Sequence, residues 1–202
     1  MTELPRKLYF GNMKIAVTGG IGSGKSYFCQ LLREKGIEVY DCDNAAKRLM
    51  ATDLRLQEEL RALVGEEVYK GNVLQKRILA SFLLQSERNK QQVNGVVHPA
   101  VARDFLESGL NWLESAILFE SGFDHRVHFD FVVAVTAPRT VRMNRIMTRD
   151  NISAEKAGEW IDCQMPSEEQ EARADAVITN DGIADLNIQT ELLLKRIATL
   201  RK

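Results

Sequence analysis

The sequence has little of three features that mark whole classes of protein. Its three cysteines, Cys29, Cys42 and Cys163, are widely spaced without a C-x-x-C pair, which argues against a disulfide framework or a zinc site and fits a reducing cytosol. Its 27 basic and 28 acidic residues leave a formal net charge of −1, whereas a general nucleic-acid binder needs a basic face. No apolar run approaches the roughly 18 residues of a membrane span. We therefore expect a cytoplasmic protein that binds neither nucleic acid nor membrane.

The length and the N-terminal segment limit the domain organisation. A chain of 202 residues, 45% of them hydrophobic, can form one α/β domain with an insertion, or at most two small domains. Residues 1–12 lack the long apolar stretch of a secretory signal. We expect them to form a short tail before a single domain over residues 13–202.

The most informative motif is G-x-x-x-x-G-K-S at residues 19–26, the pattern of a phosphate-binding loop. Glycines allow the backbone to curl so that successive N–H groups point at a phosphate. Lys25 would reach the β- and γ-phosphates, and the Ser26 hydroxyl would coordinate Mg²⁺. The apolar run 13–18 predicts a strand before the loop, and residues 26–35 predict a helix after it. We expect the nucleotide to contact Gly20, Ile21, Gly22, Ser23, Gly24, Lys25, Ser26 and Tyr27.

Four later apolar segments, separated by helical patterns, predict further strands: residues 37–40, 116–119, 131–135 and 176–179. Strands that alternate with helices indicate a parallel sheet covered on both faces. The carboxyl ends of such strands share one edge, where ligands bind. Polar residues follow these strands, namely Asp41 and Asp43, Glu120 and Asn180. The expected fold is therefore a three-layer α/β fold with a five-stranded parallel sheet.

The long segment between the second and third strands contains helical patterns and no convincing strand. Residues 53–64 and 75–85 have helical periodicity, and a third helix is expected over 99–108, with Pro99 in its first turn. This segment is far longer than a plain crossover connection. We interpret residues 50–112 as a helical insertion over the nucleotide edge, where a second substrate would bind.

The segment after the fourth strand resembles a lid over residues 145–172. A helix is expected over 138–149, and Ser153 caps a second helix that continues to about residue 164. The charged residues 167–173 follow, and residues 186–200 predict a final amphipathic helix. His125 and His128 form H-x-x-H without an acidic or cysteine partner at metal spacing, so we interpret them as loop residues.

Asp43 and two arginines are the best candidates for chemistry beside the phosphate loop. Asp43 follows the second strand, where it could accept the proton of an acceptor hydroxyl; the alternative is that Asp41 and Asp43 only cap the helix near Asn44. Arg145 and Arg149 lie one helical turn apart and share a face. Guanidinium groups bind phosphate oxygens bidentately. On a lid, they would enter the site on closure and limit transfer to water.

Together these segments resemble the dephospho-coenzyme A kinase family. The resemblance extends in order over nearly the whole chain after Met13. It rests on T-G-G-I-G-S-G-K-S at 18–26, G-I-x-V-x-D-x-D at 36–43, H-P at 98–99, I-L-F-E at 117–120, R-x-x-x-R-D at 145–150, Gln164, and A-D-x-V-I-x-N-x-G at 174–182. Tyr27 departs from the family, which usually has Thr after G-K-S.

The resemblance implies a P-loop kinase that uses ATP and Mg²⁺ to phosphorylate the ribose 3′-hydroxyl of dephospho-coenzyme A. It implies that Asp43 is the base and that Lys25 and Arg149 stabilise the transferring phosphoryl group. Asn180 and Gly182 would lie near the adenine, with Arg145 also at the nucleotide. His98 and Glu120 would lie beside the acceptor. We expect a monomer or small homo-oligomer.

Two other functions remain open from the residues alone. Another small-molecule kinase of this type, acting on a nucleoside monophosphate, gluconate or shikimate, would keep the loop and lid but have a different acceptor pocket. A nucleotide-dependent switch would hydrolyse slowly and bind partners, but the guanine-selecting N-K-x-D motif is absent.

Overall fold

A computed structural model describes residues 11–200, so most of the expected tail over residues 1–12 lies outside the described residues. The described chain forms two compact units. Residues 41–109 form the second unit, and the described residues before and after them form the first. No helix within residues 11–200 is long and apolar enough to cross a membrane.

The first unit contains a five-stranded sheet in the order β2-β5-β1-β6-β7. The strands are β1 (Ile15–Thr18), β2 (Val39–Asp41), β5 (Trp112–Glu114), β6 (Phe131–Thr136) and β7 (Ala176–Thr179). β1 pairs in parallel with both β5 and β6, and β6 pairs in parallel with β7. Because β1 is central and runs directly into the phosphate loop, the loop begins at the middle of the sheet edge. The predicted α/β fold is confirmed.

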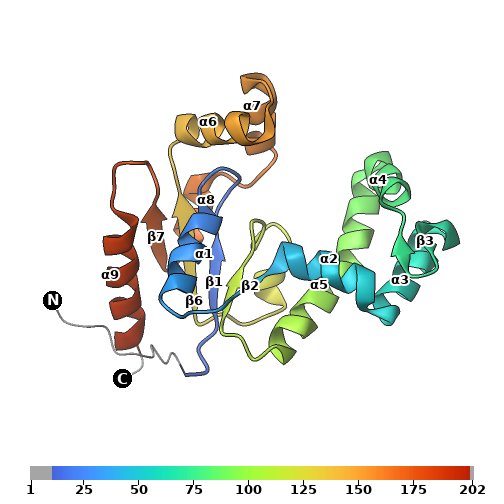
Figure 1. The fold of residues 1–202 in the computed structure, drawn as a ribbon, viewed down its shortest axis with the longest axis horizontal. Helices are drawn as coiled ribbons and strands as arrows, with labels where there is room; N and C mark the ends of the chain where they lie inside the picture. The colour runs from blue at the N-terminus through green and yellow to red at the C-terminus, as the bar shows by residue number, and fades with distance from the viewer. Residues whose placement is uncertain (1–10, 201–202) are drawn as a thin grey trace. The chain divides into compact units, whose positions relative to one another are not determined.

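Helices cover both faces of this sheet. α1 (Lys25–Glu34) and α9 (Leu186–Thr199) pack against each other on one face, and α8 (Ser167–Arg173) packs against β6 behind the sheet (Figure 1). The core between α1, α9 and the strands is apolar, and its fully buried members include Ile15, Val17, Phe28, Leu32, Val133, Leu194 and Ile197. Burial of these residues fixes the base from which the loop projects.

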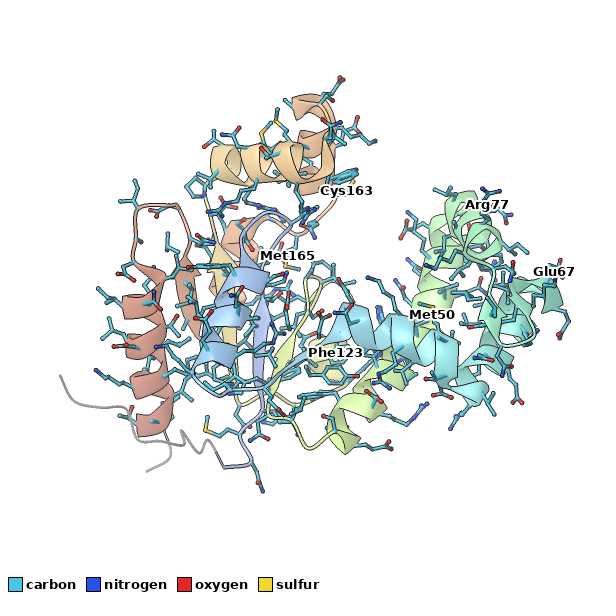
Figure 2. All side chains as sticks on the ribbon, in the orientation of Figure 1. Met50, Glu67, Arg77, Phe123, Cys163 and Met165 are labelled. Carbon is cyan, nitrogen blue, oxygen red and sulfur yellow. The ribbon has the colours of Figure 1, made fainter. Side chains whose placement is uncertain are left out.

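Two helices and their own small core form the segment expected to be a lid. α6 (Arg139–Asp150) and α7 (Ala154–Asp162) pack around Ile146, Ala157 and Ile161. Ser153 caps α7 as predicted, since its Oγ accepts a hydrogen bond from the Lys156 N–H at 3.2 Å. Cys163 and Met165, labelled in Figure 2, lie in the link to α8.

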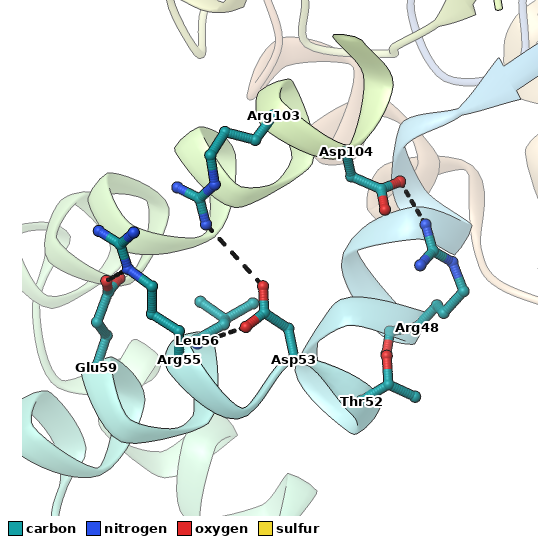
Figure 3. Close-up of polar contacts among 8 residues, drawn as sticks. All are labelled: Arg48, Thr52, Asp53, Arg55, Leu56, Glu59, Arg103 and Asp104. Carbon is teal, nitrogen blue, oxygen red and sulfur yellow. Dashed lines mark hydrogen bonds and ion pairs between the residues drawn. The ribbon is translucent and has the colours of Figure 1, made fainter. Parts of the chain in front are cut away.

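The second unit is built mainly from helices: α2 (Cys42–Thr52), α3 (Leu54–Val64), η1 (Glu66–Val68), α4 (Lys76–Gln85) and α5 (Glu87–Glu107). α5 contacts α2, α3 and α4. Figure 3 shows polar contacts between these helices: Arg48 donates to Asp104, and Arg103 lies 4.0 Å from Asp53, which also caps α3 through the Leu56 N–H. A hairpin of β3 (Tyr69–Lys70) and β4 (Val73–Leu74) completes it.

Three predicted elements are wrong. The third strand is β5, not residues 116–119, which instead form a turn in which Leu118 and Phe119 are buried and Ile117 is exposed. The Phe123 N–H donates to the Leu118 carbonyl at 3.0 Å and closes it. α5 begins at Glu87 after the Ser86 cap, so Pro99 lies inside the helix and not in its first turn. The segment expected to lack strands contains the β3–β4 hairpin. Apolar runs and prolines are local signals, and in these places packing decided the outcome.

Candidate active site

The phosphate loop is closed by backbone contacts within itself. The Ser23 N–H donates to the Gly20 carbonyl at 3.1 Å, and the Phe28 N–H donates to the Gly24 carbonyl at 3.1 Å. Gly24 has φ +90, and a Cβ there would lie 1.9 Å from Nδ2 of Asn180. Both the backbone conformation and the close packing therefore require glycine at position 24.

Lys25, the lysine of the motif, forms a buried ion pair. Its Nζ lies 3.2 Å from Oε1 of Glu114, and the two side chains are only 10% and 12% exposed. Glu114 ends β5, the strand beside β1, and also hydrogen-bonds the Cys29 thiol. Burial and the neighbouring Glu114 charge raise the pKa of Cys29. The loop lysine is thus held in place by an acidic residue that the sequence analysis missed.

Arg145 and Asn180 brace the centre of the loop. Arg145 Nη1 donates to the carbonyls of Gly22 and Ser23 at 3.2 and 3.3 Å, and its Nη2 donates to Asn180 Oδ1 at 3.1 Å. Asn180 is 7% exposed and donates to the Ser23 carbonyl at 3.0 Å. The structure therefore brings these two predicted residues to the loop. Gly182 lies exposed in the segment after β7, and a Cβ there would meet no atom within 4 Å.

Arg142 and Gln164 hold the peptide groups on either side of Ile21, and the sequence analysis assigned neither of them a site role. The Ile21 N–H donates to Gln164 Oε1 at 2.6 Å, and the Ile21 carbonyl accepts from Arg142 Nε at 2.9 Å. Arg142 is 4% exposed, and burial, the largest cause, lowers its pKa.

Arg149 has a different environment from Arg145. Its guanidinium donates to both carboxylate oxygens of Asp150, the shortest distance being 2.7 Å, and its side chain is 61% exposed. This hydrogen bonding raises the pKa of Arg149 and lowers that of Asp150. Arg149 therefore presents an accessible guanidinium with an intrahelical partner, whereas Arg145 is already bound to the loop.

Ser26 and Tyr27 lie exposed in the first turn of α1, Tyr27 with 51% of its surface accessible. An exposed hydroxyl at Ser26 and the carboxylate of Glu114 are hard oxygen donors of the kind that Mg²⁺ prefers. Within the described residues, no group of three or more His, Cys, Asp or Glu could hold a metal ion. His128 has an 89% exposed side chain, as expected of a loop residue.

In the second unit, Asp41 and Asp43 have separate places. Asp41 caps α2, because its Oδ1 accepts from the Asn44 N–H at 2.9 Å. Asp43 lies in the first turn of α2 and is exposed. The capping alternative therefore describes Asp41, while Asp43 remains open to a ligand. His98, the third predicted residue of this unit, lies within α5.

Glu120 does not follow a strand directly, because β5 ends at Glu114. Its Oε1 accepts from the Met165 N–H at 3.1 Å and from Gln170 Nε2 at 3.5 Å. Glu120 thus ties the turn after β5 to the link between α7 and α8.

The missed residues had weak signals in the sequence. A strand predicted over residues 112–114 would have ended at Glu114. An acidic residue that follows a strand near the phosphate loop is a recurring feature of P-loop proteins, so this placement would have indicated Glu114. Arg142 lies one turn before Arg145 on the same helix face. Gln164 was noticed as part of a family pattern, but its contact with Ile21 spans 143 positions.

Comparisons with known proteins identify the family of this chain. A family model described as dephospho-CoA kinase matches residues 13–185. The dephospho-CoA kinase of Bacteroides fragilis is 44% identical over 177 residues, which cover 84% of this chain and 85% of that protein.

Two solved structures are similar over almost the whole chain. The Thermus thermophilus protein TT1252 has a TM-score of 0.75 at 34% identity, covering 94% of this chain and 98% of that one. The dephospho-CoA kinase from Campylobacter jejuni has a TM-score of 0.64 at 23% identity with the same coverage, a likeness of fold. By sequence, motif and fold, this chain belongs to the dephospho-CoA kinase family.

Proposed function

We propose that this protein transfers the γ-phosphoryl group of ATP to the ribose 3′-hydroxyl of dephospho-coenzyme A, giving coenzyme A and ADP. The observation that carries the proposal is a complete phosphate loop, braced by Arg142, Arg145, Gln164 and Asn180, in a chain whose family match extends over residues 13–185. Phosphoryl transfer requires mostly positioning and charge stabilisation, which such a loop provides.

Lys25 would bind the β- and γ-phosphates and stabilise charge on the transferring group. In the described structure its Nζ is paired with Glu114, at 3.2 Å. A nucleotide in the loop would offer Lys25 a second anionic partner without removing it from its place. Glu114 therefore acts as a holder that keeps the ammonium aligned before the nucleotide arrives.

The residues of the loop fit Mg²⁺ by the chemistry of their donors. We propose that the Ser26 hydroxyl and the Glu114 carboxylate hold the ion, in the roles of the P-loop Ser/Thr and of the acidic residue on the neighbouring strand. When bound, Mg²⁺ neutralises charge on the phosphate oxygens.

Asp43 would accept the proton of the acceptor hydroxyl. Its exposed position in the first turn of α2 leaves the carboxylate accessible, and the role comes from its match to the family pattern. Asp41, two positions earlier, is occupied as the helix cap. The Asp43 carboxylate would therefore act in the reaction, while the Asp41 carboxylate stabilises the start of α2.

The two arginines of α6 would have different roles at the nucleotide. Arg145 would contact the nucleotide while it braces Gly22 and Ser23 and binds Asn180. Asn180 and Gly182 would lie beside the adenine. Arg149 would exchange its exposed Asp150 partner for the γ-phosphate. We propose that residues 145–172 act as the lid that brings Arg149 to the phosphate.

The acceptor would bind at the helical insertion of residues 50–112, with His98 and Glu120 among its contacts. Within this insertion, Lys76 stands where the family usually has arginine, and residues 83–86 (LLQS) stand where it commonly has F-x-N-P. We also propose that the protein works in the cytoplasm as a monomer or small homo-oligomer and does not bind nucleic acid, in keeping with its free thiols and near-neutral net charge.

A panel of acceptors tests the function. ADP release is measured with MgATP and dephospho-coenzyme A, adenosine monophosphate, shikimate or gluconate at equal concentration. We expect dephospho-coenzyme A to give a kcat/KM higher than the others by a factor on the order of 10³ or more, because a site that hydrogen-bonds its acceptor strongly rejects analogues. Preference for another acceptor would contradict the proposed substrate, and slow ADP release that no acceptor stimulates would favour a switch.

A further inference from the structure

Ile21 is held from three sides by residues outside the phosphate loop. Gln164 accepts from its N–H at 2.6 Å, and Arg142 donates to its carbonyl at 2.9 Å. Its side chain packs against the α6–α7 cluster of Ile146, Ala157 and Ile161. A loop residue that belongs to the hydrophobic core of another segment links the conformations of the two.

Arg142 is the polar centre of this link. Its Nη1 donates to Ser167 Oγ at the start of α8 at 2.8 Å, while its Nε binds the Ile21 carbonyl. Its Nη2 is buried and has no hydrogen-bond partner among the described residues. A Cβ on Gly20 would lie 2.3 Å from this Nη2, so the guanidinium fills the space that a side chain at position 20 would take.

The environment of Arg142 is unfavourable for a cation, because burial removes the guanidinium from water. Among residues 11–200, its hydrogen bonds go to neutral groups, the Glu168 and Asp162 carboxylates oppose the lowering of its pKa without forming an ion pair with it, and its side chain is almost completely buried. A buried cation whose hydrogen bonds go to neutral groups opposes folding, and apolar side chains of similar volume are often more stable in such places. The stability of the fold alone therefore does not explain a guanidinium at this position. Its two hydrogen bonds, which connect the phosphate loop to the start of α8, do explain it.

We propose that Arg142 is a positioning residue for the nucleotide phosphates, because it fixes the Ile21 peptide and joins the phosphate loop to the α6–α7 segment. The inference rests on the proposed function only in that the loop binds ATP. It predicts that nucleotide binding changes the surroundings of Trp160 in α7, because Trp160 packs against the same cluster as Ile21. Trp160 is one of two tryptophans in the chain, so its emission reports on this link.

The first experiment compares Arg142→Gln with Arg139→Gln. Arg139 lies on the same helix but is 50% exposed and paired with Asp162, so its variant is the matched control. Binding of ADP and of a non-hydrolysable ATP analogue is measured by calorimetry without acceptor, and Trp160 emission is followed on binding, with Trp160→Phe used to assign the signal. The KM for ATP and kcat are then measured separately.

For Arg142→Gln we expect nucleotide Kd and the KM for ATP to rise by a factor on the order of 10, since a charge-assisted hydrogen bond is lost. We expect kcat at saturating ATP to change by less than about threefold, because the lost contact acts on binding, and the Trp160 response to disappear. Arg142→Lys keeps one donor group and should be intermediate. A lower melting temperature with unchanged Kd and an unchanged Trp160 response would mean that Arg142 is only structural.

A second variant reaches the same contact from the loop. Gly20→Ala puts a Cβ 2.3 Å from Arg142 Nη2 and, less closely, 3.1 Å from Gln164 Oε1, and it leaves the guanidinium in the protein. If the guanidinium positions the loop, Gly20→Ala raises the nucleotide Kd, and the double variant with Arg142→Gln is no weaker than Arg142→Gln alone. Additive losses would overturn the inference. Because binding is measured without acceptor, failure to phosphorylate dephospho-coenzyme A would leave this test intact.

Discussion

The phosphate loop and the helical unit of residues 41–109 are held together in different ways. The polar contacts of the loop come from far along the chain: Arg142 to Ile21 spans 121 positions, Arg145 to Gly22 spans 123, and Asn180 to Ser23 spans 157. In the helical unit, many polar pairs lie one turn apart on exposed surfaces, as in Arg55 with Glu59.

This difference indicates how each region tolerates substitution. The loop contacts are buried or part-buried and share partners, so the removal of one leaves others without a partner. The helical unit is held mainly by packing of α5 against its neighbours, and its surface polar groups can change without loss of fold. We expect substitutions to be costly around the loop and tolerated in the helical unit, with Asp43 as the exception.

The largest expected effect follows the removal of the loop lysine. Lys25→Ala should lower kcat/KM for ATP by a factor on the order of 10³, because it removes the cation for the transferring group. It also leaves Glu114 buried without its partner. Steady-state kinetics measure kcat/KM for ATP and calorimetry measures ATP affinity, with thermal melts as the control. In the Lys25→Ala, Glu114→Gln double variant, stability should recover while binding does not, and unchanged ATP affinity would contradict the phosphate cradle.

The next largest effect is expected at the exception in the helical unit. Asp43→Asn should keep ATP affinity and lower turnover by a factor on the order of 10² or more, since general-base catalysis is lost. Asp41→Asn is the matched control, because asparagine caps helices as well as aspartate does. Near-normal turnover of the Asp43 variant would remove this residue from the mechanism, and equal losses in both variants would point to α2 as a whole.

Two glycines sharpen the comparison through stability. Gly24 and Gly71 have φ of +90 and +60, but a Cβ meets Asn180 at 1.9 Å in the first case and no atom within 4 Å in the second. Gly71→Ala should lower the free energy of unfolding by about 1 kcal/mol through backbone strain alone. Gly24→Ala should lower it by about 3 kcal/mol or more, since overpacking is added to the strain, and should abolish ATP binding. Chemical denaturation compares them, and equal losses would show that the loop is not tightly packed.

The smallest effect is expected on the helical surface. Arg55→Ala removes a pair with Glu59 whose side chains are 70% and 38% exposed. The free energy of unfolding should fall by no more than about 0.5 kcal/mol, with kcat/KM unchanged. A loss of activity here would break the comparison, because it would place a functional contact on the exposed face of α3.

Local signals in the sequence predicted the elements whose boundaries depend on neighbouring residues. β7 has the predicted bounds, and the phosphate loop, α1 and the Ser153 cap were recognised from spacing alone. The third strand was misplaced because Leu118 and Phe119 are buried in a turn, where they look like strand residues. The start of α5 was missed because a proline near a helix start and a proline within a helix give similar patterns.

The candidate site was only partly predictable for a physical reason. Lys25 and Ser26 belong to the sequence motif and were predicted from it. The other three residues contact the loop only in the folded chain, and no spacing in the sequence reveals them: Glu114, Arg142 and Gln164. Helical spacing puts Arg145 and Arg149 on one face and does not separate their environments, yet one is bound to the loop and the other to Asp150. Their separate environments follow from how far each lies along α6 from the loop.

The most direct test of the account is to identify the product and the position of its new phosphate. The protein is incubated with MgATP and dephospho-coenzyme A, and the product is analysed by mass spectrometry and by phosphorus and proton NMR. The account predicts the gain of one phosphate on the ribose 3′-oxygen, and no gain with a non-hydrolysable ATP analogue. An unmodified acceptor in the presence of intact ATP binding, or a phosphate at another position, would contradict it.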